Sequence, residues 1–146
     1  MDINETLNEV LVKLFRDINT IEERAIRTEE YRDMTANDMH VIEAIGTGEP
    51  KNMTTVAKLL SVTTGTLTIS MNSLVKKGYV QRVRSEEDRR VVLVSLTEKG
   101  KRAFDHHKRF HDEMIRQVLK GLDREEQEIL RKALLNLMDF FEKRKG

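Results

Sequence analysis

Apolar residues recur at steps of three and four positions along most of this chain, which is the spacing of amphipathic helices. The steps are regular over residues 3–26, so we expect a long first helix there, followed by a polar loop at 27–34. Thr35 or Asn37 can cap a second helix, because their side-chain oxygens accept hydrogen bonds from the first helical N–H groups. That helix is predicted to end at Gly46.

Two closely spaced helices are predicted next. The first covers residues 53–61, begins with a threonine cap and places on its buried face Val56, Leu59 and Leu60. After a polar joint at 61–64, a threonine-rich segment repeats apolar residues at helical spacing and ends at Gly78, a residue type that readily adopts the left-handed conformation of a helix end. Two short helices with a tight joint form a helix-turn-helix, whose second member enters the major groove of DNA.

Two β-rich runs, 79–84 and 91–96, follow directly and are separated by a six-residue polar loop. A helix, a glycine, a strand, a polar loop that contains arginines and a second strand together are the plan of a recognition helix followed by a wing. The hairpin strengthens the helix-turn-helix prediction considerably, because a helix pair alone is common in small helical proteins.

Two further helices are predicted after the hairpin. Thr97 can cap the first, which runs to about Lys120, and Asp123 with Glu126 has capping-box spacing for the last. We interpret their broad apolar stripes and the first helix as a dimer interface; an ordinary intramolecular core is the alternative. The fold class is therefore mostly α with a small β-hairpin wing. The predicted organisation is a single domain over 1–146, a winged helix-turn-helix part at 35–96, and dimerisation helices at 1–30 and 97–146.

The distribution of charge along the chain indicates that this helical protein binds nucleic acid. Residues 51–95 hold eight basic and three acidic side chains, a net charge of +5, whereas the whole chain has a net charge of +1. A basic centre with acidic flanks is typical of DNA-binding proteins. The chain has no cysteine, no apolar run near the ~18 residues of a membrane span and no secretory signal, so we expect a cytoplasmic protein. The motifs of phosphate-binding and hydrolytic enzymes are absent, so we expect no enzyme activity.

The chain resembles the MarR family of dimeric winged-helix regulators over essentially its whole length. The most specific stretch is RVRSEEDRRVVLVSLTEKG at 82–100, which is similar to the family's wing signature, an Asp-x-Arg core followed by a strand and a Leu-Thr-x-x-Gly helix start. The segment from Thr63 to Val92 and HKRFH at 107–111 look most like the FabT branch, the repressors of bacterial fatty-acid biosynthesis. The resemblance implies a homodimer on double-stranded DNA, with Arg90 in the minor groove and Asp88 holding the loop.

The predicted DNA contacts come from the threonine helix and the wing. Hydroxyl groups can bind phosphates, threonine methyls can pack on thymine methyls, and Asn72 can pair with adenine if it faces the groove. Since the helix has no arginine and no lysine before its last turn, we expect a palindromic operator with an A·T-rich core. The candidate DNA-binding residues are Thr54, Thr63, Thr64, Thr66, Thr68, Ser70, Asn72, Lys76, Lys77, Arg82, Arg84, Asp88, Arg89 and Arg90.

The effector is predicted from the resemblance alone. Members of the FabT branch respond to long-chain acyl groups on acyl carrier protein, and such a chain needs an apolar slot. The candidate lining residues are Leu14, Ile18, Met39, His40, Ile42, Phe104, His107, Phe110, His111 and Met114. We expect no bound cofactor or metal. Two alternatives stay open: a zinc-responsive regulator that uses His40, His107 and His111, and a winged-helix module whose basic face binds an acidic protein.

Overall fold

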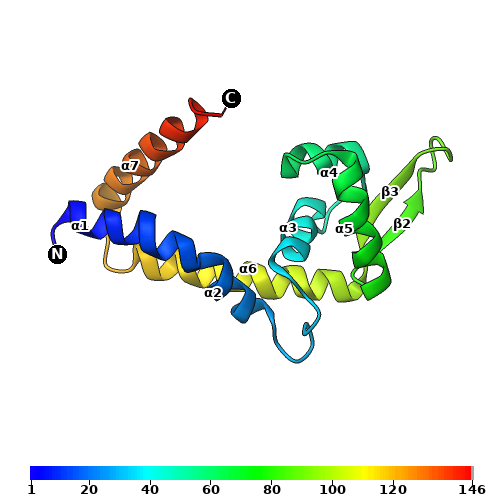
Figure 1. Cartoon of the computed structure of the whole chain (residues 1–146), viewed down its shortest axis with the longest axis horizontal. Coiled ribbons are helices and arrows are strands. Elements are labelled where there is room, and N and C mark those ends of the chain that lie inside the picture. The colour runs from blue at the N-terminus through cyan, green and yellow to red at the C-terminus, as the bar shows by residue number, and fades with distance from the viewer. Residues whose placement is uncertain (146) are drawn as a thin grey trace. The chain divides into compact units, whose positions relative to one another are not determined.

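The computed structural model describes residues 1–145, apart from the side chain of Asn19. It divides into two compact units, Met1–Phe110 and a second that begins at His111, and each is described by itself. Among the described residues, no helix is both long and apolar enough to cross a membrane. The predicted fold class is confirmed: the chain is mostly helical with a small antiparallel sheet (Figure 1).

The predicted long first helix is confirmed, but its middle is wound differently. It consists of α1 (Ile3–Asn8), the π-helical segment η1 (Glu9–Leu14) and α2 (Phe15–Ile26) in direct succession. Asp2 caps it, accepting a hydrogen bond from the N–H of Glu5 at 2.8 Å. Apolar spacing does not distinguish an α turn from the wider π turn, so the sequence does not predict the π segment.

The segment 27–34, predicted as a polar loop, contributes to the core. Tyr31 and Met34 are buried, and the Arg27 Nε donates to the Met34 carbonyl at 3.1 Å, which closes the loop. Composition favours a solvated loop here, but two apolar anchors hold it against the helices.

The helix-turn-helix is the pair α4 (Met53–Leu60) and α5 (Thr64–Lys77), and α3 (Ala36–Ile45) precedes it in the chain. Thr35 caps α3 as predicted, in a capping box with Asp38. The expected threonine cap of α4 is wrong: the side chain of Asn52 accepts from Thr55 N at 2.8 Å and begins the helix. Leu59 was also expected to be buried, but it is 60% exposed, whereas Val56 and Ala57 fill the core.

The wing is a sheet of three antiparallel strands, β1 (Lys51–Asn52), β2 (Val80–Arg84) and β3 (Val92–Leu96), in the order β1-β3-β2. The predicted hairpin of β2 and β3 is confirmed, with Val80 opposite Leu96 and Arg84 opposite Val92. The two-residue strand β1 is too short to leave a period-two signal in the sequence.

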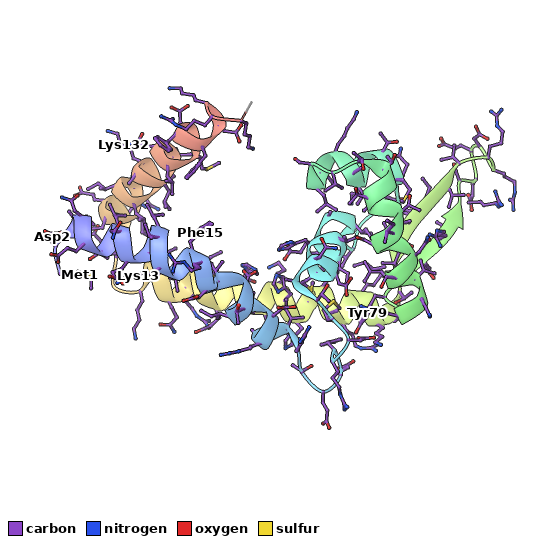
Figure 2. The ribbon with its side chains drawn as sticks, in the orientation of Figure 1. Met1, Asp2, Lys13, Phe15, Tyr79 and Lys132 are labelled. Carbon is purple, nitrogen blue, oxygen red and sulfur yellow. The ribbon has the colours of Figure 1, made fainter. Side chains whose placement is uncertain are left out.

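Tyr79 links the recognition helix, the sheet and the next helix, α6 (Glu98–Leu119). This tyrosine is fully buried where α5 ends and β2 begins (Figure 2). Gly100 passes so close to its backbone that an added Cβ would lie 2.1 Å from the Tyr79 carbonyl oxygen. Thr97 caps α6 as predicted, accepting from Gly100 N at 3.1 Å, and its hydroxyl donates to the Gly78 carbonyl at 2.6 Å.

The second unit contains the end of α6 and α7 (Arg124–Glu142), joined at Gly121, which has a φ of 80°. Asp123 and Glu126 form the predicted capping box. The apolar stripe of this unit is largely open to solvent. Its exposed large side chains include Ile115, Val118, Ile129, Leu134, Met138 and Phe141.

Candidate nucleic-acid interface

Helix α5 is capped at both ends, and one of its faces is packed in the core. Thr63 begins it by accepting a hydrogen bond from Thr66 N at 3.1 Å, and Gly78 ends it with a φ of 87°. The buried face consists of Leu67, Met71 and Leu74. The opposite face of α5 is therefore free to meet a ligand.

One line of residues runs along the outward face of α5 at steps of four, three and four positions. It consists of Gly65, Ile69, Asn72 and Lys76, and all four are exposed. Ile69 is 75% exposed, and the prediction of a hydroxyl-bearing face did not include it. The sequence does contain a signal for it. Ile69 lies two positions from both Leu67 and Met71, so helical spacing places it on a different face from these buried residues.

The hydroxyl groups of α5 are less available than predicted. Thr68 donates its proton to the Thr64 carbonyl at 2.8 Å, and the Thr63 hydroxyl bonds to that of Thr66 at 3.0 Å. Ser70 is half-buried and accepts from Asn37 Nδ2 at 3.1 Å, so it joins α5 to α3 and does not lie on the outward line. Thr54, also predicted to contact DNA, is exposed at the start of α4.

Asn72 lies on the outward line and is oriented by the wing. Arg82 of β2 donates from Nη2 to the Asn72 Oδ1, so the amide group of Asn72 directs its Nδ2 hydrogens away from that contact. An oriented amide donor can bind an acceptor on a base edge in the major groove.

Lys77, predicted to bind phosphate, is directed into the protein. Its Nζ lies 2.8 Å from Asp38 Oδ2 and 2.8 Å from the Asp33 carbonyl oxygen, and its side chain is 26% exposed. Tyr79 donates to Asp33 Oδ1 at 2.7 Å, and burial together with this hydrogen bond raises the pKa of Tyr79 above its usual value. We therefore assign Lys77 to holding α5 in place, whereas its neighbour Lys76 is exposed.

The wing tip is built around Asp88. Its Oδ1 accepts from the Arg90 N and Nε, and its Oδ2 accepts from Arg90 Nη2, each at 3.0 Å. These hydrogen bonds from the Arg90 side chain and backbone lower the pKa of Asp88. Arg90 nevertheless has a side chain that is 91% exposed, so its guanidinium is both oriented and accessible.

The other wing arginines are distributed along the hairpin. Arg84 Nη1 donates to the Arg89 carbonyl at 2.9 Å and braces the loop, and Arg84 and Arg89 are both exposed. Ser85 N donates to the Val91 carbonyl at 2.9 Å, which closes the loop at its base. The hairpin therefore presents one oriented, exposed guanidinium, that of Arg90, at its tip beside two exposed glutamates of the loop. A guanidinium suits a narrow, negatively charged groove.

The residues predicted to line an effector pocket differ in burial and in the unit to which they belong. Met39 and Ile42 are buried in the core, Phe104 packs against that core, and Ile18 and Phe110 are half-buried. Leu14 is exposed on the first helix. His111 and Met114 belong to the second unit.

The histidines of the first unit also differ from each other. His107 is buried, and its Nε2 contacts the Glu43 carboxylate. His40 is exposed, so the two histidines that the zinc alternative draws from this unit have different environments.

Comparison with known proteins agrees with this geometry. The family model for the transcriptional regulators SarA/Rot matches residues 26–107. The structure is similar to that of Streptococcus pneumoniae FabT in complex with DNA, with 41% sequence identity and a TM-score of 0.84 over 97% of this chain and 99% of that chain. A mutant MarR from E. coli complexed with operator DNA is 27% identical, with a TM-score of 0.60 over 94% and 99% of the two chains.

The curated relatives are also regulators. The uncharacterized HTH-type transcriptional regulator YpoP of Bacillus subtilis is 25% identical over 122 residues, which is 84% of this chain and 79% of that protein. The matched regions include the recognition helix and the wing described above. The chain belongs to the SarA/Rot family of transcriptional regulators, with the winged-helix fold of the MarR-type DNA-binding proteins.

Proposed function

We propose that this chain is a homodimeric repressor that binds a palindromic, A·T-rich operator and controls fatty-acid biosynthesis genes in response to long-chain acyl groups on acyl carrier protein. The observation that carries the proposal is the wing tip, where Asp88 orients a guanidinium that stays 91% exposed beside an outward-facing recognition helix. The likeness to FabT bound to DNA supports the regulated pathway.

Unpaired apolar surface supports a homodimer. The first helix exposes Ile3, Leu7, Leu11 and Phe15, with Phe15 labelled in Figure 2, and the second unit exposes a stripe of its own on α7. Contiguous apolar surface of this kind marks an interaction site, and isologous dimers are the commonest closed assembly. A dimer places two recognition helices about 34 Å apart, in successive major grooves of a palindrome.

The side chains offered to DNA favour an A·T-rich operator. Arg90 suits the narrow, strongly negative minor groove of A·T-rich sequences. The outward line of α5 carries Ile69 and Asn72 at its centre and a cation, Lys76, only in its last turn, so a bidentate arginine contact to guanine is missing from this line.

The proposal is tested by fluorescence anisotropy with promoter duplexes of fatty-acid biosynthesis genes. We expect sequence-specific binding that weakens steeply with salt, because phosphate contacts release counterions, and binding that changes on adding long-chain acyl carrier protein. A response to zinc instead would support the zinc-responsive alternative. Salt-independent behaviour, or failure to bind any duplex, would support the protein-binding alternative.

A further inference from the structure

Ile69 is an apolar side chain placed where the recognition helix meets its ligand. It is 75% exposed, the highest value among the large hydrophobic residues of the described segment 27–96. A β-branched residue at an exposed helical position contributes less to helix stability than alanine does, and here it adds little to the core. Its position therefore points to contact with a partner.

Gly65, one turn before Ile69 on the same outward line, provides an independent observation. An added Cβ would meet only the Thr63 Oγ1, at 3.9 Å, and the helix there has ordinary backbone angles. Neither crowding within the chain nor backbone conformation accounts for the glycine, although glycine weakens a helix. A missing side chain at this point lets another surface approach the backbone of α5 closely.

The neighbours of Ile69 define the chemistry of that surface. Thr68 donates its hydroxyl proton to the Thr64 carbonyl, so it offers no free donor beside Ile69. Asn72, the next residue on the line, presents an amide donor oriented by Arg82. The centre of the face is thus apolar, with one donor beside it. In the major groove, the thymine C5-methyl is the apolar group of a base pair and the adjacent O4 is an acceptor.

We propose that Ile69 is a specificity-determining residue that packs on thymine C5-methyl groups in each half-site, with Asn72 donating to an adjacent base acceptor. This inference rests on the proposed DNA-binding function. It deepens that proposal, because it assigns part of the A·T preference to a direct methyl contact in the major groove in addition to the arginine in the minor groove.

The test uses a duplex carrying the palindrome that the wild-type chain selects from random DNA. Thymines of one half-site are replaced one at a time by deoxyuridine, which lacks only the C5-methyl, and affinity is measured by anisotropy. We expect the wild-type affinity to fall about fourfold at one or two positions, the factor equivalent to about 0.8 kcal/mol for one buried methyl-sized group. Ile69→Ala should bind the thymine duplex more weakly and show no further loss on the deoxyuridine duplex.

Leu59→Ala is the matched control, because Leu59 is also an exposed apolar residue of the helix-turn-helix. It should keep the wild-type sensitivity to deoxyuridine. Ile69→Ala should fold normally, since alanine is the better helix former. Equal deoxyuridine sensitivity of Ile69→Ala and wild type, or no sensitive thymine, would overturn the methyl contact while leaving DNA binding intact. Failure of the wild-type chain to select any DNA would overturn the proposed function as well.

Discussion

The ammonium group of Lys77, at the end of the recognition helix, lies 2.8 Å from the carboxylate of Asp38 in the first turn of α3. Asp38 is buried, and its Oδ2 also accepts from Thr35 N at 3.1 Å as part of the α3 capping box. One carboxylate therefore both caps α3 and anchors α5. The orientation of α5 relative to α3 depends on this ion pair between Lys77 and Asp38, which are 39 positions apart in the chain.

Replacing Lys77 by methionine should lower the free energy of unfolding by about 1–3 kcal/mol, because it leaves the buried carboxylate of Asp38 without its cation. The partial exposure of Lys77 keeps this value below that of a fully buried pair. Urea unfolding measures the change. Lys76→Met removes the same charge from an exposed neighbour and should stay within about 0.5 kcal/mol of wild type; equal effects of the two changes would refute the anchoring role.

The carboxyl group of Asp88 should titrate below its ordinary pKa, because the side chain and backbone of Arg90 donate hydrogen bonds to the ionised form. A lowered folded-state pKa means that the contribution of this pair is present above the ordinary pKa and is lost as the pH falls through the lowered value. The wing tip should thus keep its geometry between pH 5 and 8. Carboxyl NMR titration of wild type and Arg90→Ala checks this: the pKa should rise in the variant, and an unchanged value would contradict the assigned pairing.

Arg90→Ala should weaken operator binding strongly and lower the slope of log affinity against log salt by about one. The physical reason is the loss of an oriented guanidinium at the wing tip. Anisotropy at several salt concentrations measures both quantities. Arg32→Ala removes the same charge from an exposed loop residue and should change neither; an intact affinity in Arg90→Ala would show that the wing does not carry the contact.

Gly65→Ala should separate stability from binding. Alanine should stabilise α5 by about 0.5–1 kcal/mol, because the added Cβ makes only an ordinary contact with the Thr63 Oγ1, at 3.9 Å, and reduces the freedom of the unfolded chain. The same methyl group should weaken operator binding if DNA approaches the helix backbone there. Thermal unfolding and anisotropy on one preparation measure both effects, and a variant that is more stable and binds with unchanged affinity would show that the ligand stays away from Gly65.

Features with local signals were predictable. Thr35, Gly78 and Asp123 mark helix ends through hydrogen bonds or backbone angles within a few residues, and the structure confirms all three. The hairpin strands were predictable from their β-rich composition. The MarR-type resemblance found on the wing motif is confirmed by the solved structures.

Features that depend on long-range contacts were not predictable. The partners of Lys77 and Ser70 lie 39 and 33 positions away, so the sequence alone could not show that both side chains face the protein. Leu59 continues an apolar helical pattern but faces solvent, because Val56 and Ala57 already fill that side of α4. Ile69 was missed because the predicted DNA contacts were hydroxyl, amide and charged side chains, so this apolar residue on the outward line was not a candidate.

Two copies of the chain should present their recognition helices and arginine-tipped wings to one duplex. Light scattering coupled to size-exclusion chromatography, at low salt with a palindromic duplex selected by the chain, measures this stoichiometry. We expect a mass of two chains without DNA, and a mass of two chains and one duplex when DNA is present. A single chain in either state, or a duplex that elutes unbound, would contradict it.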